Sequence, residues 1–259
     1  MLHWLLLSFW LFGQTQDPYI NTGGQTIVTR LIPPAGYIRP VTTNFGNYLR
    51  AFPLKAHGSS VKTYKGELSA LNPYSKAVLD LPLEKQDLLQ CADALMYLRA
   101  AYLRSNKQED KIAFHFVSGL LCDYASYKQG YRYTQQGKWL KKAEPSSSAQ
   151  TFNSYLRLVY GYASTLSLEK ELKKVSVNTG LEVGDVFIRG GSPGHCFIVV
   201  DVVKNTQGKS LFALVQGFMP SQNVHVVHHN GNIWFELGQD YSQDLPYGEL
   251  ISSKYLKRF

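Results

Sequence analysis

Cysteine is scarce in this sequence, whose 259 residues contain three, at Cys91, Cys122 and Cys196. Small secreted domains that depend on disulfides carry more cysteines, usually in even numbers. The odd count therefore excludes a disulfide framework. It leaves room for at most one bridge and one free thiol.

We expect no membrane-spanning segment in the mature chain. The apolar run within residues 1–16 holds roughly ten residues and stops at polar ones, which suits the core of a signal peptide rather than a membrane helix. The run lacks Lys and Arg at its start, and a buried N-terminal segment is the alternative. We expect residues 1–16 to be a signal peptide and the protein to be exported, to the periplasm or beyond.

Acidic residues are fewer than basic ones, 19 against 27, which gives a net charge of +8. Such a surface favours anionic partners, and peptidoglycan or another anionic envelope polymer fits. No block of Lys and Arg and no recognition motif supports nucleic acid as the partner.

Patterns for a bound metal or phosphate are also missing, so we expect no metal and no cofactor. Gly190 and Gly191 precede no helix and no P-loop Lys, which argues against a phosphate loop. His225, His228 and His229 are close in sequence, but on a strand only His225 and His229 would share a face. No carboxylate is fixed beside them to complete a metal site.

The hydrophobic periodicity predicts an α+β fold, with helices mixed among strands and an antiparallel sheet in the C-terminal part. We expect one domain over residues 17–259. Helices are predicted at 47–52, 84–104, 149–163 and, after an N-cap at Ser167, 168–173. Strands are predicted at 61–64, 77–81, 112–117, 195–202, 211–217, 224–229 and 233–237, the last two joined by a turn at Asn230–Gly231.

The stretch from Gly184 to Asp201 places one titratable side chain, His195, at the start of a strong strand. Neighbouring strand residues face opposite ways, so Cys196 belongs to the core with Ile198 and Val200. Asp201 is six residues from His195, roughly 20 Å along a strand, and is too far to orient its ring.

Gln216 is the better partner for His195, because a compact hairpin places it diagonal to His195 on the same face. An amide there can fix the tautomer of an imidazole. The alternative is that Gln216 satisfies its own backbone neighbours. In the predicted helix 84–104, Cys91 lies on the apolar stripe and is expected to pack in the core, with a reactive role as the alternative. Asp93 lies off the stripe and is expected to be solvated, with a functional role as the alternative.

Gly184-Asp-Val-Phe187, Gly194-His195 and the apolar strand resemble the second half of the NlpC/P60-like, papain-related cell-wall cysteine peptidases. The resemblance implies a papain-like fold, His195 as general base and Gln216 as its orienting residue. That family places its nucleophilic cysteine at the start of an upstream helix, where the thiol pKa is lowered. The predicted helix 149–163 begins without a cysteine, and Cys122, followed by Asp123, remains the candidate nucleophile.

Most of the chain resembles a secreted bacterial family known as domain of unknown function 4846. The resemblance is carried by Asn47-Tyr-Leu-Arg50, Pro53-Leu-Lys55, Ala77-Val-Leu-Asp-Leu81, Gln90-Cys-Ala-Asp-Ala94, Leu98-Arg99, Phe114-His-Phe116, Gly130-Tyr-Arg132, residues 165–172, residues 184–201, Gln216 and Met219-Pro220. It implies an exported bacterial protein and no established activity.

Two functions follow from these features. One is a papain-like amide hydrolase that acts on envelope peptide or peptidoglycan, with Tyr127, Tyr131, Arg132 and Gly194 in substrate binding. The other is a catalytically inactive module that binds an envelope glycan or peptide through the same cleft. The missing cysteine at a helix start favours the second, and the His195–Gln216 pair favours the first.

Overall fold

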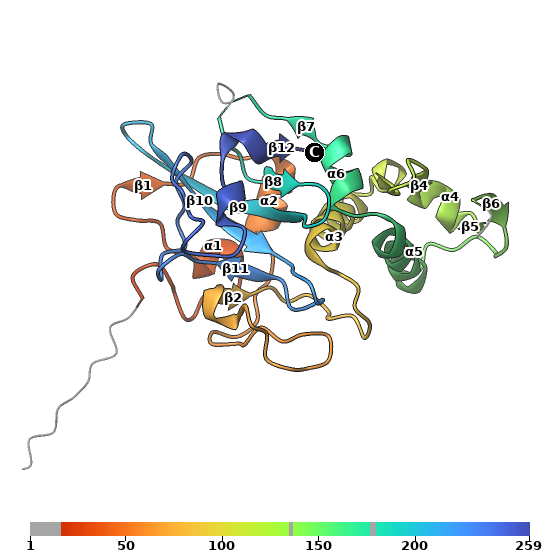
Figure 1. The fold of residues 1–259 in the computed structure, drawn as a ribbon, viewed down its shortest axis with the longest axis horizontal. Helices are drawn as coiled ribbons and strands as arrows, with labels where there is room; N and C mark the ends of the chain where they lie inside the picture. Colours follow the sequence, from red (N-terminus) through yellow and green to blue (C-terminus); the bar gives the residue numbers. More distant parts are fainter. Residues whose placement is uncertain (1–16, 135–136, 177–179) are drawn as a thin grey trace, which may run out of the picture.

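The computed structural model describes residues 17–134, 137–176 and 180–259 (Figure 1). The predicted signal peptide, residues 1–16, lies outside the described residues.

An antiparallel sheet of eight strands forms the centre of the described structure (Figure 1). Seven strands follow the order β2-β11-β10-β9-β8-β12-β7, and β1 pairs with the far end of β9. The strands are β1 (Tyr37–Ile38), β2 (Ser75–Val78), β7 (Lys173–Lys174), β8 (Val186–Arg189), β9 (His195–Asn205), β10 (Ser210–Gln216), β11 (His225–Val227) and β12 (Leu256–Arg258). The predicted α+β class is confirmed, and the sheet also recruits β1 and β2 from the N-terminal part.

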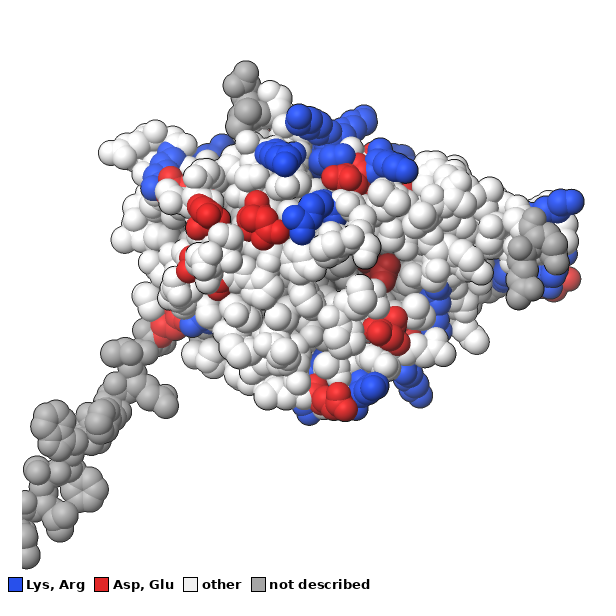
Figure 2. Space-filling model, viewed as in Figure 1, with Lys and Arg blue, Asp and Glu red and all other residues white. Residues whose placement is uncertain are grey.

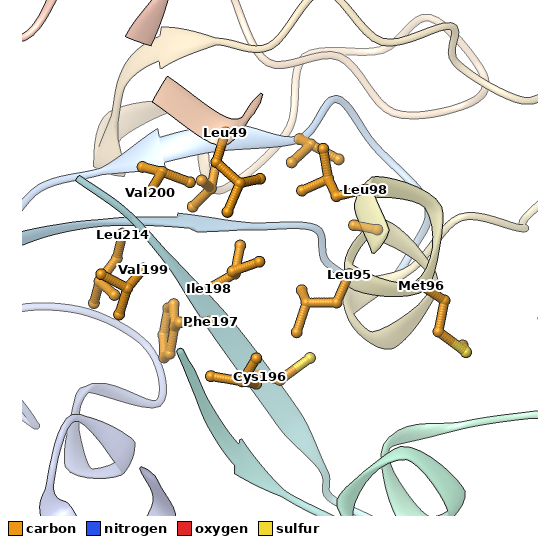
Figure 3. Packing of buried hydrophobic residues seen from close by; sticks show 14 of the residues in the cluster. Leu49, Leu95, Met96, Leu98, Cys196, Phe197, Ile198, Val199, Val200 and Leu214 are labelled. Carbon is orange, nitrogen blue, oxygen red and sulfur yellow. The ribbon is translucent and has the colours of Figure 1, made fainter. Parts of the chain in front are cut away.

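Strand β9 is the central member of the sheet, and its first nine residues are all buried. Cys196 and Ile198 lie on the side of β9 that faces Leu95 of helix α3 (Cys91–Ser105), whereas Phe197 points to the other side (Figure 3). The alternation predicted for this strand is therefore confirmed. It places Cys196 in the core, fully buried.

A β-bulge between Ala213 and Leu214 sets the register at the end of β10. A compact hairpin with Ser210 or a neighbour opposite Val203 would place Gln216 opposite Phe197. The structure pairs Leu211 with Val203, which is one residue away from Ser210. The bulge then shifts the ladder by one, so Val215 pairs with Ile198 and Gln216 comes opposite Phe197. The predicted position of Gln216 is thus reached through two offsets that compensate.

The α-helices are α1 (Ile27–Arg30), α2 (Asn44–Arg50), α3, α4 (Tyr124–Lys128), α5 (Ala149–Tyr162) and α6 (Thr165–Glu171). Prediction and structure agree closely for α5. Helix α6 begins three residues earlier than expected, because Ser164 rather than Ser167 is its N-cap.

The prediction that a helix begins at residue 84 is wrong, since α3 begins at Cys91. Leu89 has a φ of 65°, a left-handed conformation that interrupts a right-handed helix. The Asp93 carboxylate then accepts a hydrogen bond from the Gln90 backbone N–H at 2.9 Å, which stabilises the helix start one residue later. Cys91 is consequently the first residue of the helix.

Away from the sheet, α4 and α5 form a lobe with four short strands at one end of the molecule (Figure 1). These strands are β3 (Ala113–His115), β4 (Leu121–Asp123), β5 (Tyr131–Tyr133) and β6 (Trp139–Lys141). No strand forms at residues 61–64, which contribute isolated bridges such as Thr63 with Gln222. The Asn230–Gly231 turn is present, with both residues at positive φ, but no strand follows at 233–237.

Asp201 lies within β9 and is fully buried. Its two oxygens accept hydrogen bonds from Arg39 Nε at 2.6 Å and Arg50 Nε at 2.8 Å. These ion pairs join the N-terminal segment to the sheet, far along β9 from His195.

Basic side chains gather at the edge of the molecule formed by β7 and β12, along the top of Figure 2. Lys173 and Lys174 of β7 are exposed there, and Lys254 is exposed beside β12. Within the described residues, no helix is long and apolar enough to span a membrane.

Candidate functional site

Cys91 is the first residue of α3 and is 8% exposed. Its thiol faces the Cys196 thiol and the His195 imidazole. These contacts, the one with Cys196 most strongly, lower the pKa of the Cys91 thiol well below its ordinary value, while burial acts in the opposite direction. The hydrogen bond from the Ala92 backbone N–H and the positive end of the helix dipole favour the same thiolate.

His195 begins β9 and is 1% exposed. Its Nε2 lies 2.7 Å from Gln216 Oε1, an atom that can only accept a hydrogen bond. Nε2 therefore carries the proton, and Nδ1 of the neutral ring is the nitrogen without one. Nδ1 is thus the ring nitrogen that remains to take a proton from the Cys91 thiol, as a general base does.

Gln216 also contacts a second histidine, His225, which begins β11. Gln216 Nε2 lies 3.1 Å from His225 Nε2, and His225 Nδ1 lies 3.0 Å from the Asn223 carbonyl oxygen. The carbonyl can only accept, so His225 Nδ1 donates to it and His225 Nε2 accepts from the amide. Burial lowers the pKa of His225 to about 4, which keeps this ring neutral at ordinary pH.

Three aromatic rings surround the His195 imidazole. Tyr247 stacks on it at a centroid distance of 4.7 Å, Phe197 meets it edge-on at 4.7 Å and Phe218 is tilted against it at 5.2 Å. Gln216 and His225 are fully buried as well. The hydrogen bonds from Gln216 to His195 and to His225 are therefore shielded from water. The imidazole is held in one orientation.

Gly217 allows the end of β10 to approach the start of α3. A Cβ atom at this position would lie 2.7 Å from the Gln90 carbonyl oxygen and 3.1 Å from the Ala94 Cβ. Only a glycine fits this contact without displacement. Gly217 thereby lets Gln216 and the helix that carries Cys91 share one site.

Asp93 was expected to be solvated, and this is wrong because it is buried in the first turn of α3. Burial raises the pKa of its carboxyl group to about 7, and the nearby Cys91 charge adds to this effect. Asp93 and Cys91 therefore disfavour each other's negative charge.

The structure places Cys122 in β4, within the lobe and paired with β3. It is fully buried, its carbonyl oxygen accepts a hydrogen bond from Tyr155, and burial raises the pKa of its thiol to about 12. A thiol in that environment is protonated and inert. Cys91, which we expected to be a packing residue, contacts His195 instead.

Of the predicted substrate-binding residues, only Gly194 lies beside His195. Tyr127 is buried, and Arg132 stacks on its ring at 3.8 Å while donating to the Tyr127 and Tyr131 carbonyl oxygens. Strand β5, which carries Tyr131 and Arg132, lies at the far end of the lobe from β9 (Figure 1). A Cβ on Gly194 would lie 2.4 Å from Thr165 Oγ1, so this glycine permits α6 to pack against the loop before β9.

Sequence reasoning missed Cys91 and His225 as members of this site. Asp93 follows Gln90 by three residues, and acidic residues favour the first turn of a helix. This pattern would have predicted a helix that starts at Cys91. His225 was considered only as a metal ligand. Its pairing with Gln216 depends on the loop between β10 and β11, which carries no register signal.

The fold and site define an α+β protein in which a cysteine at a helix start meets a histidine and a glutamine on adjacent antiparallel strands. The chain belongs to the family described as domain of unknown function 4846, whose model matches residues 27–255. Comparison with curated proteins finds no match, and comparison with solved structures finds none.

Proposed function

We propose that this protein is a thiol-dependent amide hydrolase of papain-like type. Cys91 is the nucleophile, His195 the general base and Gln216 the residue that orients His195. The observation that carries the proposal is the contact of the Cys91 thiol with the His195 imidazole, whose Nε2 is held by Gln216. The lack of a cysteine at a helix start was the argument for an inactive binding module over a hydrolase. Cys91 is such a cysteine, so this argument against a hydrolase no longer holds.

The reaction follows from the positions of these groups. His195 Nδ1 takes the thiol proton, and the Cys91 sulfur attacks the amide carbonyl carbon to form a tetrahedral adduct. N–H groups in the first turn of α3 have no acceptor within the helix and stabilise the oxyanion. His195 then protonates the leaving amine as the C–N bond breaks, and a water deprotonated by His195 hydrolyses the thioester.

We further propose that the protein is exported and that its substrate is an envelope peptide, such as the peptide of peptidoglycan. The resemblance to NlpC/P60-like peptidases supports the bond type. The net charge of +8 and the basic edge at β7 and β12 support an anionic polymer as the larger target.

The test is release of soluble peptides from purified peptidoglycan by the mature protein. Wild type and Cys122→Ala should both release them, whereas Cys91→Ala and His195→Ala should not. In parallel, iodoacetamide should label Cys91 at a pH well below the ordinary thiol pKa of about 8.5. Equal traces from wild type and Cys91→Ala, together with no labelling of Cys91, would overturn the proposal.

A further inference from the structure

Cys196 is a buried thiol that the proposed mechanism does not use, yet it contacts the proposed nucleophile. It follows His195 directly on β9 and is fully buried, whereas Cys91 retains 8% exposure. Helix α3 packs against β9, and the Cys196 side chain lies on the helix side of the strand (Figure 3). The two thiols are close enough for each to shift the pKa of the other.

We propose that Cys91 and Cys196 form a reversible disulfide when the protein meets a peroxide. The proposal rests on the reactive Cys91 thiolate that the proposed function also requires. Cys91 is the residue that the oxidant reaches, because it has exposed surface and Cys196 has none. Cys122 takes no part, since it lies in the separate β3–β4 pair.

The chemistry balances in two steps. The Cys91 thiolate attacks one oxygen of hydrogen peroxide, the O–O bond breaks, and the sulfur is oxidised to a sulfenic acid. The hydroxide that leaves takes the proton that Cys91 gave to His195 and becomes water. The Cys196 sulfur then attacks the Cys91 sulfur, the S–O bond breaks, and the hydroxide that leaves takes the Cys196 proton to become water. Two thiols and one peroxide give one disulfide and two waters.

Two features suit Cys196 to this role. Burial, and then the neighbouring Cys91, raise the pKa of its thiol, so it stays protonated while Cys91 is a thiolate. The part of this shift that comes from Cys91 is lost when Cys91 becomes a neutral sulfenic acid, and Cys196, unlike Cys122, then has an electrophilic sulfur beside it. Its position in the first nine residues of β9, all buried, also keeps it from other oxidants. The disulfide protects Cys91 from irreversible oxidation and switches hydrolysis off, because it consumes the nucleophile.

The test is mass spectrometry of the full mature chain after treatment with hydrogen peroxide and capping of the remaining thiols. We expect a peptide pair linked through Cys91 and Cys196, with one thiol left free at Cys122. Dithiothreitol should restore labelling of Cys91. In Cys196→Ala, peroxide should instead carry Cys91 to the sulfinic acid, which dithiothreitol does not reverse.

The wild-type measurement decides the matter even if Cys196→Ala does not fold. Sulfinic acid at Cys91 without a linked peptide in wild type would overturn the proposal. The proposed function is judged separately by peptide release under reducing conditions. A linked pair without peptide release would contradict the hydrolase, and peptide release without a linked pair would contradict the disulfide.

Discussion

At the scale of single residues, the site is a chain of hydrogen bonds in which every atom has one role. Asn223 O accepts from His225, His225 accepts from the Gln216 amide, and Gln216 Oε1 accepts from His195. The direction is imposed from one end by a carbonyl oxygen that cannot donate. His195 Nδ1 is left free to take a proton from Cys91.

Loss of the Gln216 amide should weaken the base without removing it. In Gln216→Ala, His195 Nε2–H loses its partner, and a hydrogen bond to a charged ring contributes about 1.5–3 kcal/mol. We expect the alkylation rate of Cys91 by iodoacetamide to fall about 10- to 100-fold. Gln216→Asn tests whether an amide on a shorter chain restores part of the rate. A rate equal to wild type in Gln216→Ala would contradict the role of Gln216.

The buried groups His225 and Asp93 should give opposite pH dependences of stability. The pKa of His225 is lowered to about 4, so the unfolded state binds more protons between pH 4 and 6.5, and stability from this group rises with pH. The pKa of Asp93 is raised to about 7, so the folded state binds more protons between about pH 4 and 7, and stability from this group falls as pH rises.

Variants that do not titrate separate the two groups. In wild type, His225 should make the unfolding free energy rise on the order of 3 kcal/mol between pH 4 and pH 6.5. In His225→Gln this rise should be absent. Asp93→Asn should make stability rise more steeply with pH over the same window. Urea unfolding at several pH values measures both slopes. Parallel curves for wild type and His225→Gln would contradict a buried neutral His225.

At the scale of elements, the site depends on where α3 begins and how closely β10 approaches it. The left-handed Leu89 and the Asp93 cap place the helix start at Cys91, so the helix dipole and free N–H groups act on that thiol. Gly217 removes the side chain that would separate Gln216 from this helix. The bulge in β10 brings Gln216 opposite Phe197.

Replacing Gly217 with Ala should force the two elements apart. The added Cβ would lie 2.7 Å from the Gln90 oxygen, and such overpacking costs about 1–3 kcal/mol in unfolding free energy. The alkylation rate of Cys91 should fall as well. Gly161→Ala in α5 is the control, because nothing lies within 4 Å of its Cβ, and it should be neutral or stabilising by up to about 1 kcal/mol. Equal effects of the two substitutions would argue against the close contact.

At the scale of the whole molecule, the N-terminal segment is tied to the sheet by a buried carboxylate. Asp201 pairs with Arg39 and Arg50, which precede it by most of the chain, and Arg50 also donates to the Val202 carbonyl oxygen at 2.9 Å. Helix α2 and β1 are thereby held against β9. The same strand carries His195 at its other end, so one strand both anchors the fold and positions the base.

Removal of this anchor should be costly. Asp201→Ala leaves Arg50 buried beside β9 without its partner, and breaking a buried ion pair in this way costs about 3–5 kcal/mol. Arg39→Ala should cost less, because the Arg39 side chain is 22% exposed and water compensates for part of the loss. Denaturant unfolding measures both. If Asp201→Ala cost less than Arg39→Ala, the assignment would be wrong.

The sequence by itself determined the features that depend on local pattern. Alternation along residues 195–202 predicted which side chains of β9 enter the core, and strand pairing predicted Gln216 beside His195. Composition and periodicity also predicted the α+β class. The alternation succeeds because side-chain direction in a strand depends on neighbouring residues alone. Gln216 reaches its predicted place because the β-bulge in β10 compensates for a one-residue difference at the turn.

Only the tertiary structure decided that Cys91, rather than Cys122, meets His195. Both cysteines are followed by helix-forming residues, and their distances from His195 depend on how α3 and the lobe pack against the sheet. The apolar stripe in the sequence begins before the first residue of α3. Periodicity therefore could not show that the helix starts at Cys91. His225 likewise reaches Gln216 through a loop whose path no local pattern fixes. The proposed nucleophile and the end of the hydrogen-bond chain are therefore properties of the folded molecule.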